Sequence, residues 1–171
     1  LKTVFEHITQ NTRRGQQLAQ FPLSMVGVDS NKTSLAETAK TMTAAGIPHH
    51  VLHGDIGDPA QMVRDFATHG IDASQVLHIR SFLDHDRPFI AVENQAMLQM
   101  RQTKLSHMYS GCFVKNDGDI REPSEVVQNL VEHLLRWADV VGGQGMVVLE
   151  VHCMSPQATA ASLETNASLY F

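Results

Sequence analysis

The feature that most constrains the fold is a repeated alternation of short apolar runs with amphipathic helical patterns. The apolar runs cover residues 23–28, 50–53 and 76–80, and each has the length of a strand rather than of a helix. Helical patterns cover residues 1–20, 33–45 and 58–70. Because a helix connects each strand to the next, the strands are expected to be parallel neighbours in a doubly wound α/β sheet.

Local signals support these helix boundaries. Gly46 and Gly70 each follow a helical pattern, at the position that glycine commonly occupies after a helix. Asp58 followed by Pro59 combines a capping side chain with a proline suited to the first helical turn. The alternation therefore predicts separate strands and helices rather than one long helical segment.

The pattern is less regular after Pro88. We expect a helix over residues 92–108, a hairpin over 109–121 with a turn at Asn116-Asp117-Gly118, and a helix from Pro123 to about residue 137. Residues 146–151 are almost continuously apolar, which predicts a further strand of the same sheet. The glycine-rich run before it, residues 142–145, precedes a strand and is therefore interpreted as a flexible joint, not a phosphate loop.

Composition narrows the function classes. A net charge of −5 argues against a nucleic-acid surface, and no apolar run approaches the length of a membrane span. The two cysteines, Cys112 and Cys153, have no paired spacing, which favours a reducing compartment and a cytoplasmic location. Helical spacing begins at Leu1 and the chain ends on the apolar residues 169–171, so we expect an internal piece of a larger fold.

Three of the predicted strands are followed by an aspartate: Asp29, Asp55 and Asp84. Ligands of parallel α/β sheets bind just beyond the carboxyl ends of the strands, so the three carboxylates are expected at a binding edge. A carboxylate there can accept hydrogen bonds from both hydroxyls of a ribose, and a neighbouring one can meet an adenine amino group. Each aspartate taken alone is also a common turn residue, and that alternative stays open.

Two histidines extend this edge. His85 lies in the polar cluster of residues 84–87, and His152 follows the run 146–151. Two histidines and one carboxylate suit iron, manganese or zinc and leave coordination positions for a substrate. Glu150 and Asp86 are candidates to orient a histidine ligand. The alternative is a charged surface loop and a histidine satisfied by backbone, which sequence spacing does not separate from a metal site.

Four motifs, in this order and spacing, resemble the S-adenosylmethionine-dependent C-methyltransferase domains of modular polyketide synthases. They are Met25-Val-Gly-Val-Asp29-Ser-Asn31, His53-Gly-Asp-Ile56, Ser81-Phe-Leu-Asp-His-Asp-Arg-Pro88 and Leu149-Glu-Val-His152. The similarity is closest to the metal-dependent branch that methylates malonyl units on acyl carrier protein, and it covers nearly the whole chain. The motif beginning at Ser81 is specific, whereas Asp29 and Gly54-Asp55 fit any nucleotide-binding sheet. The resemblance implies a Rossmann-like class I methyltransferase fold that is incomplete at both ends, with residues 1–171 forming a single partial domain.

The resemblance also implies site residues and partners. The residues implied for S-adenosylmethionine are Asp29 at the ribose, Asp55 and Ile56 at the adenine, and Asn31, Ser81 and Phe82 beside them. The implied metal, iron or manganese, would be held by Asp84, His85 and His152, and the two histidines would be catalytic. The implied reaction is attack of a malonyl-type enolate on the sulfonium methyl group. The substrate would be carried on the phosphopantetheine of an acyl carrier protein, among neighbouring synthase domains.

Two other classes fit the same residues. A nicotinamide-dependent oxidoreductase would use Asp29 and the same sheet for a different cofactor. A non-catalytic scaffold of a megasynthase would leave the polar strand ends without a ligand.

Overall fold

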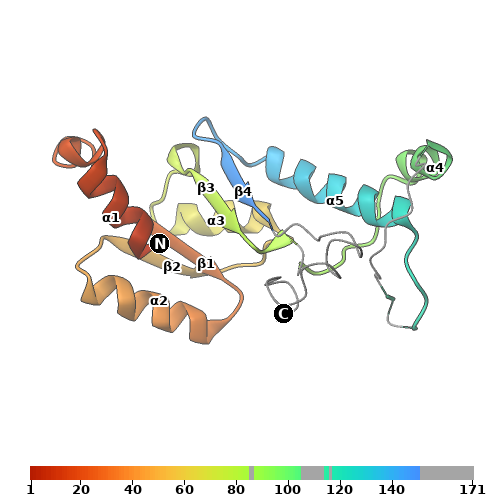
Figure 1. Cartoon of the computed structure of the whole chain (residues 1–171), viewed down its shortest axis with the longest axis horizontal. Helices are drawn as coiled ribbons and strands as arrows, with labels where there is room; N and C mark the ends of the chain where they lie inside the picture. The colour runs from red at the N-terminus through yellow and green to blue at the C-terminus, as the bar shows by residue number, and fades with distance from the viewer. Residues whose placement is uncertain (85–86, 105–113, 116, 151–171) are drawn as a thin grey trace, which may run out of the picture. The chain divides into compact units, whose positions relative to one another are not determined.

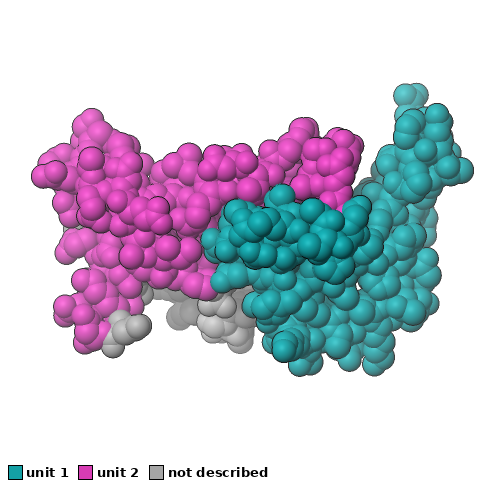
Figure 2. Space-filling view, turned by 180° about the vertical axis from the view of Figure 1, so that it is seen from behind, with its two compact units in different colours: residues 1–70 teal, residues 71–171 magenta. Residues whose placement is uncertain are grey.

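The computed structural model describes residues 1–84, 87–104, 114–115 and 117–150. The chain divides into two compact units, Leu1–Gly70 and Ile71–Phe171, which Figure 2 shows in teal and magenta. Each unit contains its own pair of parallel strands. None of the helices within the described ranges combines the length and the apolar character needed to cross a membrane.

The first unit is built on two parallel strands, β1 (Met25–Asp29) and β2 (His49–His53). Their register runs from Met25 opposite His49 to Asp29 opposite His53. The connecting helix α2 (Lys32–Ala44) packs on both strands (Figure 1). Helix α1 (Lys2–Asn11), a 3₁₀ turn η1 (Gly15–Gln17) and helix α3 (Pro59–Thr68) complete the unit. The strand–helix–strand order predicted from the sequence is confirmed here.

The capping residues account for the ends of these helices. Asp58 accepts a hydrogen bond from the Gln61 backbone N–H at 2.9 Å, and Pro59 occupies the first turn of α3. Gly46 and Gly70 have φ angles of +64° and +70°, the left-handed conformation that glycine adopts most easily. These signals are local, and the predictions based on them are confirmed.

One helix is shorter than its sequence pattern predicts. The pattern of residues 1–20 predicts a single helix, but α1 ends at Asn11 and the chain turns extended at Thr12, with φ −127° and ψ 159°. Asparagine and threonine are weak helix formers, and Gly15 follows them, so the helix ends and only the 3₁₀ turn η1 continues.

The core of the first unit lies between the sheet and its helices. Met25, Met42 and Ile47 are buried together, and Phe5 packs against them. Gly27, in the middle of β1, is needed for this packing: a Cβ atom there would lie 3.1 Å from Thr38 Cγ2 and 3.2 Å from Leu1 Cδ1. Absence of a side chain therefore lets the helices approach the sheet.

The second unit repeats the parallel pairing with strands far apart in sequence. Strand β3 (His78–Ser81) pairs with β4 (Met146–Leu149), with His78 opposite Met146 and Ser81 opposite Leu149. The helices are α4 (Gln95–Lys104) and α5 (Pro123–Ala138), which pack together, and a 3₁₀ turn η2 (Ala73–Gln75) precedes β3. The hairpin prediction is confirmed for the described residues, since Val114 and Ile120 form an antiparallel bridge around Gly118.

One prediction about the sheet is wrong. The sequence pattern predicts four strands in one parallel sheet, but the described residues form two sheets of two strands, β1–β2 and β3–β4. The pairing of β4 with β3 agrees with the prediction, and every ladder between named strands is parallel. Apolar periodicity identifies a strand and its faces but carries no information on its hydrogen-bonding partner, which explains the error. The α/β class with helices between parallel strands holds.

Candidate functional site

The carboxyl edge of the first sheet begins at Asp29, the last residue of β1. Its Oδ1 accepts a hydrogen bond from the Asn31 backbone N–H at 2.8 Å. The Asn31 carboxamide oxygen in turn accepts from the backbone N–H groups of Thr33 and Ser34, at 2.8 and 3.3 Å, which caps α2. Within the described residues these contacts use only one oxygen of the Asp29 carboxylate and leave the other for a ligand.

The neighbouring strand ends beside it. The Gly54 backbone N–H donates to the Asp29 carbonyl oxygen at 3.1 Å, so the two strand ends are hydrogen-bonded beyond the ladder. A Cβ atom on Gly54 would lie 2.5 Å from Val28 Cγ1, so glycine is required for this approach. Asp55 follows, and its Oδ1 accepts from the Gly57 backbone N–H at 2.7 Å. The structure thus brings Asp29, Asn31, Asp55 and the adjoining Ile56 to one strand edge, and their binding roles stay predictions. The third aspartate predicted for this edge, Asp84, instead follows β3, which belongs to the other sheet.

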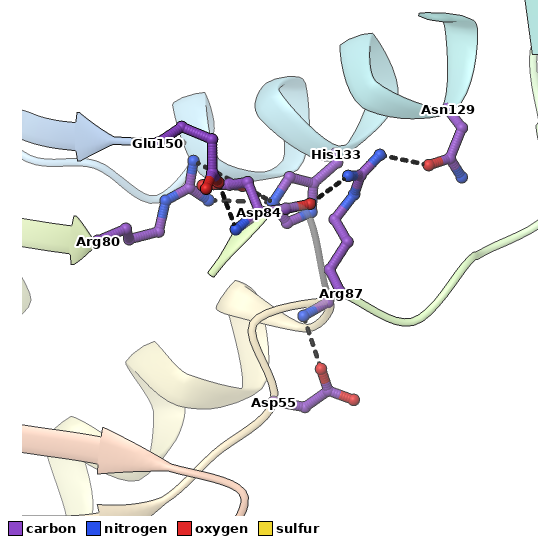
Figure 3. A network of polar contacts seen from close by, with 8 residues as sticks. Asp55, Arg80, Asp84, Arg87, Asn129, His133 and Glu150 are labelled. Atoms are coloured by element: carbon purple, nitrogen blue, oxygen red, sulfur yellow. Dashed lines mark hydrogen bonds and ion pairs between the residues drawn. The ribbon is translucent and has the colours of Figure 1, made fainter. Parts of the chain in front are cut away.

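The second unit contains a buried cluster of charged side chains, shown in Figure 3. Arg80 comes from β3, Asp84 from the segment after it, and His133 from α5. The Asp84 Oδ1 atom lies 3.2 Å from Arg80 Nη2 and 2.9 Å from His133 Nε2. Arg80 Nη1 lies 3.0 Å from the same His133 nitrogen. The three residues are 3%, 6% and 0% exposed, so the cluster is shielded from water.

Further contacts hold the backbone of Asp84 from both sides. Its N–H donates to Glu150 Oε2 at 2.7 Å, and its carbonyl oxygen accepts from Arg87 Nη1 at 2.6 Å. Arg87 also donates to Asn129 Oδ1 at 2.5 Å, and the Asn129 amide donates to the Ile90 carbonyl oxygen (Figure 3). The segment that follows β3 is thereby fixed to α5 and to the residue that follows β4.

Opposite charges face each other in this network. Arg80 and Arg87 are cationic, and Asp84 and Glu150 are the carboxylates that oppose them. Burial lowers the pKa of both arginines, and the carboxylates counteract that shift. Burial and the charge of Arg87 lower the pKa of His133 to about 4, although Asp84 acts in the other direction. His133 is therefore neutral near pH 7.

The α5 residues that face this network lie one helical turn apart. Asn129, His133 and Trp137 are spaced at four-residue intervals and so share one face of α5. The Arg80 guanidinium lies 4.6 Å from the Trp137 ring centroid, and the His78 ring meets the same indole edge-on, with centroids 5.4 Å apart. Sequence reasoning missed these α5 residues, although their i, i+4, i+8 spacing was the available signal.

The cofactor residues predicted in this unit, Ser81 and Phe82, lie at the end of β3. Ser81 is its last residue, and Phe82 donates its N–H to the Leu149 carbonyl oxygen at 2.8 Å. Phe82 has a φ of +58° and a side chain that is 57% exposed. A left-handed conformation is strained for a residue of this size, and such strain is found where surrounding contacts impose it.

The predicted metal site is described only in part. His85 and His152 lie outside the described residues, as do Asp86, Cys112 and Cys153. Across the described ranges no group of three His, Cys, Asp or Glu side chains is arranged to hold a metal. The Asp84 Oδ1 atom is shared between an arginine and a histidine, while its buried Oδ2 atom has no hydrogen-bond partner among the described residues, so the ligand role of Asp84 stays a prediction. Glu150, predicted to orient a histidine ligand, accepts a hydrogen bond from the Asp84 backbone N–H, and its role toward a histidine stays a prediction.

Comparison with known proteins identifies the family. A methyltransferase-domain family model, described as the AprA MT2-like domain, matches residues 1–171. The search of curated proteins found no match. The matched range includes both the strand edge at Asp29 and the network around Asp84. The chain therefore belongs to the AprA MT2-like family of methyltransferase domains.

Proposed function

We propose that this domain uses S-adenosylmethionine to methylate a carbon atom of a malonyl-type thioester carried on an acyl carrier protein. Membership of a methyltransferase family supports the class of reaction. The observation that supports binding of the cofactor is the edge formed by Asp29 and Gly54-Asp55, where two parallel strands end side by side. The polyketide substrate, the carrier protein, the neighbouring synthase domains and a cytoplasmic location rest on the resemblance of the sequence motifs.

Each residue of this edge has a distinct part in the proposal. The Asp29 oxygen that is not bonded to the Asn31 N–H accepts a hydrogen bond from the ribose, while Asp55 accepts from the adenine amino group. Ile56 supplies an apolar contact to the base, and the Asn31 turn holds the Asp29 carboxylate in place. S-adenosylmethionine supplies an electrophilic methyl group. The protein's contribution is then mainly to hold the substrate carbon in line with the methyl carbon and the sulfur.

In the transfer itself, a general base accepts a proton from the substrate carbon, and the electron pair left on that carbon forms the new bond to the methyl carbon. The carbon–sulfur bond breaks, and its electrons remain on sulfur. His85 and His152 remain the predicted catalytic residues for this step. Metal assistance also remains a prediction that depends on these two histidines, and no step is assigned to a metal because both histidines lie outside the described residues.

The test is a calorimetric titration of the full-length protein with S-adenosylmethionine and, separately, with NAD. Asp29→Ala should weaken S-adenosylmethionine binding roughly ten- to hundredfold, the effect of losing a hydrogen bond to a charged group. Asp65→Ala is the matched control: it removes a surface carboxylate of α3 in the same unit, and binding should not change.

Tighter binding of NAD than of S-adenosylmethionine would favour the oxidoreductase alternative, and binding of neither would favour a scaffold. Mass spectrometry of a malonyl-loaded acyl carrier protein tests the substrate. A methyl group that stays on the acyl carbon after thioester hydrolysis is expected, whereas methylation elsewhere or none would contradict the proposal.

A further inference from the structure

His53 occupies a position that the predicted set of cofactor residues does not include. It is the last residue of β2 and the register partner of Asp29, the last residue of β1. In a parallel pair, residues at the same register position project from the same face of the sheet, about 5 Å apart. The imidazole of His53 is therefore a lateral neighbour of the carboxylate proposed to bind the ribose.

The backbone keeps this juxtaposition in place. The Gly54 N–H donates to the Asp29 carbonyl oxygen at 3.1 Å, which extends the pairing one residue past the strand ends. A Cβ atom on Gly54 would come within 2.5 Å of Val28 Cγ1, so the chain after His53 lies tightly against β1. A shift in register that separated His53 from Asp29 would break both features.

The side chain of His53 is not used in the packing of the first unit. Its side chain is exposed, and among the described residues it makes no side-chain hydrogen bond. By contrast, His49 at the other end of β2 is half-buried and bonds through Nδ1 to the Ile47 carbonyl oxygen at 2.7 Å. The Asp29 carboxylate has one oxygen that is not bonded to the Asn31 N–H. By register, the His53 side chain is the neighbour of this carboxylate at the end of the sheet.

We propose that Asp29 and His53 together bind the vicinal diol of the nucleoside, with the carboxylate on one hydroxyl and the imidazole on the other. A neutral imidazole has one nitrogen that donates and one that accepts, and so does a hydroxyl group, which makes them complementary. This inference rests on the proposed function, since it assumes a nucleoside cofactor at this edge. It adds a residue that determines specificity for ribose over deoxyribose.

The experiment compares His53→Ala with His50→Ala in the full-length protein. His50 is three residues earlier in the same strand and is the register partner of Val26, so it projects from the opposite face. Each variant is titrated with S-adenosylmethionine and then with adenosine, 2′-deoxyadenosine and 3′-deoxyadenosine as competing probes. Thermal melting of each variant confirms that the fold is retained.

His53→Ala should weaken binding of S-adenosylmethionine about three- to tenfold, the loss expected for one neutral hydrogen bond. His53→Ala should weaken the binding of adenosine by the same factor. It should leave the binding of one of the two deoxyadenosines unchanged, because that probe lacks the hydroxyl that His53 contacts. His50→Ala should bind every probe as the wild-type protein does.

Asp29→Ala, titrated in parallel, distinguishes a failure of the role of His53 from a failure of the proposed function. Weaker binding in Asp29→Ala together with unchanged binding in His53→Ala overturns the role of His53 and leaves the proposed function intact. Equal losses in His53→Ala for adenosine and both deoxyadenosines also overturn it, since the imidazole would not be reading a hydroxyl. If the wild-type protein does not bind S-adenosylmethionine, both the proposed function and this inference fail.

Discussion

Loss of the buried Asp84 carboxylate is the change that should most affect the stability of the second unit. The variant Asp84→Asn keeps the shape of the side chain but removes its charge. Arg80, whose side chain is 4% exposed, would then be a buried cation without its carboxylate at 3.2 Å. Removing one partner of a buried ion pair costs about 3–5 kcal/mol, because the remaining charge is neither hydrated nor compensated. We expect the free energy of unfolding to fall by that amount.

The assay is urea unfolding followed by the fluorescence of Trp137, the single tryptophan of the chain, whose ring lies 4.6 Å from the Arg80 guanidinium. The matched control is Glu6→Gln, which breaks the pair between Lys2 and Glu6 at 3.7 Å, where both side chains are about half exposed. That exposed pair should contribute at most about 0.5 kcal/mol. A third variant replaces Arg80, Asp84 and His133 together by Met, Leu and Leu. It should be about as stable as the wild type, since apolar side chains of similar size need no compensating charge.

A loss below about 1 kcal/mol in Asp84→Asn would refute the reasoning, because it would mean that the Arg80 charge is solvated in the folded protein. The measurement is repeated with EDTA and with added divalent metal. A loss that appears only with metal present would assign Asp84 to a metal site instead of to the arginine–histidine network.

Two further predictions concern pH and packing. Because the pKa of His133 is about 4 in the folded protein and about 6.5 when unfolded, the unfolded chain binds a proton first as pH falls, and stability should decrease between about pH 6.5 and 4 by at most about 3 kcal/mol. Urea unfolding between pH 7.5 and 5.5 measures this slope, and a slope equally steep in His133→Gln would contradict its origin in this residue. Gly27→Val should lower the stability of the first unit by about 1–3 kcal/mol, because its Cβ would lie 3.1 Å from Thr38 Cγ2. Circular-dichroism melting tests this against Gly143→Ala, which has open space and should be nearly neutral; equal melting temperatures for the two variants would count against the close packing.

The two units differ in how much the sequence reveals. In the first unit, Asp58-Pro59, Gly46 and Gly70 are local signals that act on the backbone within a few residues, and the helices they predict are present. The position of Asp29 was also predictable, because the last residue of a parallel strand lies at the carboxyl end of the sheet.

The second unit depends on contacts between distant residues. His133 meets Asp84 across 49 positions, and Glu150 meets it across 66. No local propensity specifies such contacts, so the pairing of the Asp84 carboxylate with an arginine and a histidine could not be predicted from the segment after β3. The i, i+4 polar spacing on α5 is a partial exception, since it marks a face that an amphipathic helix would otherwise fill with apolar residues.

The unequal chain separation of the two strand pairs has a consequence for folding kinetics. Register partners lie 24 positions apart in β1–β2 but 68 apart in β3–β4. Closing the longer loop costs more chain entropy, and the hydrogen bonds and packing that offset this cost form only when both strands are present. During synthesis, the first sheet can pair as soon as β2 emerges, whereas β3 must wait until β4 has been translated. Arg80 and Asp84 therefore stay hydrated until β4 has been translated, and their charges are dehydrated only when β3 and β4 pair.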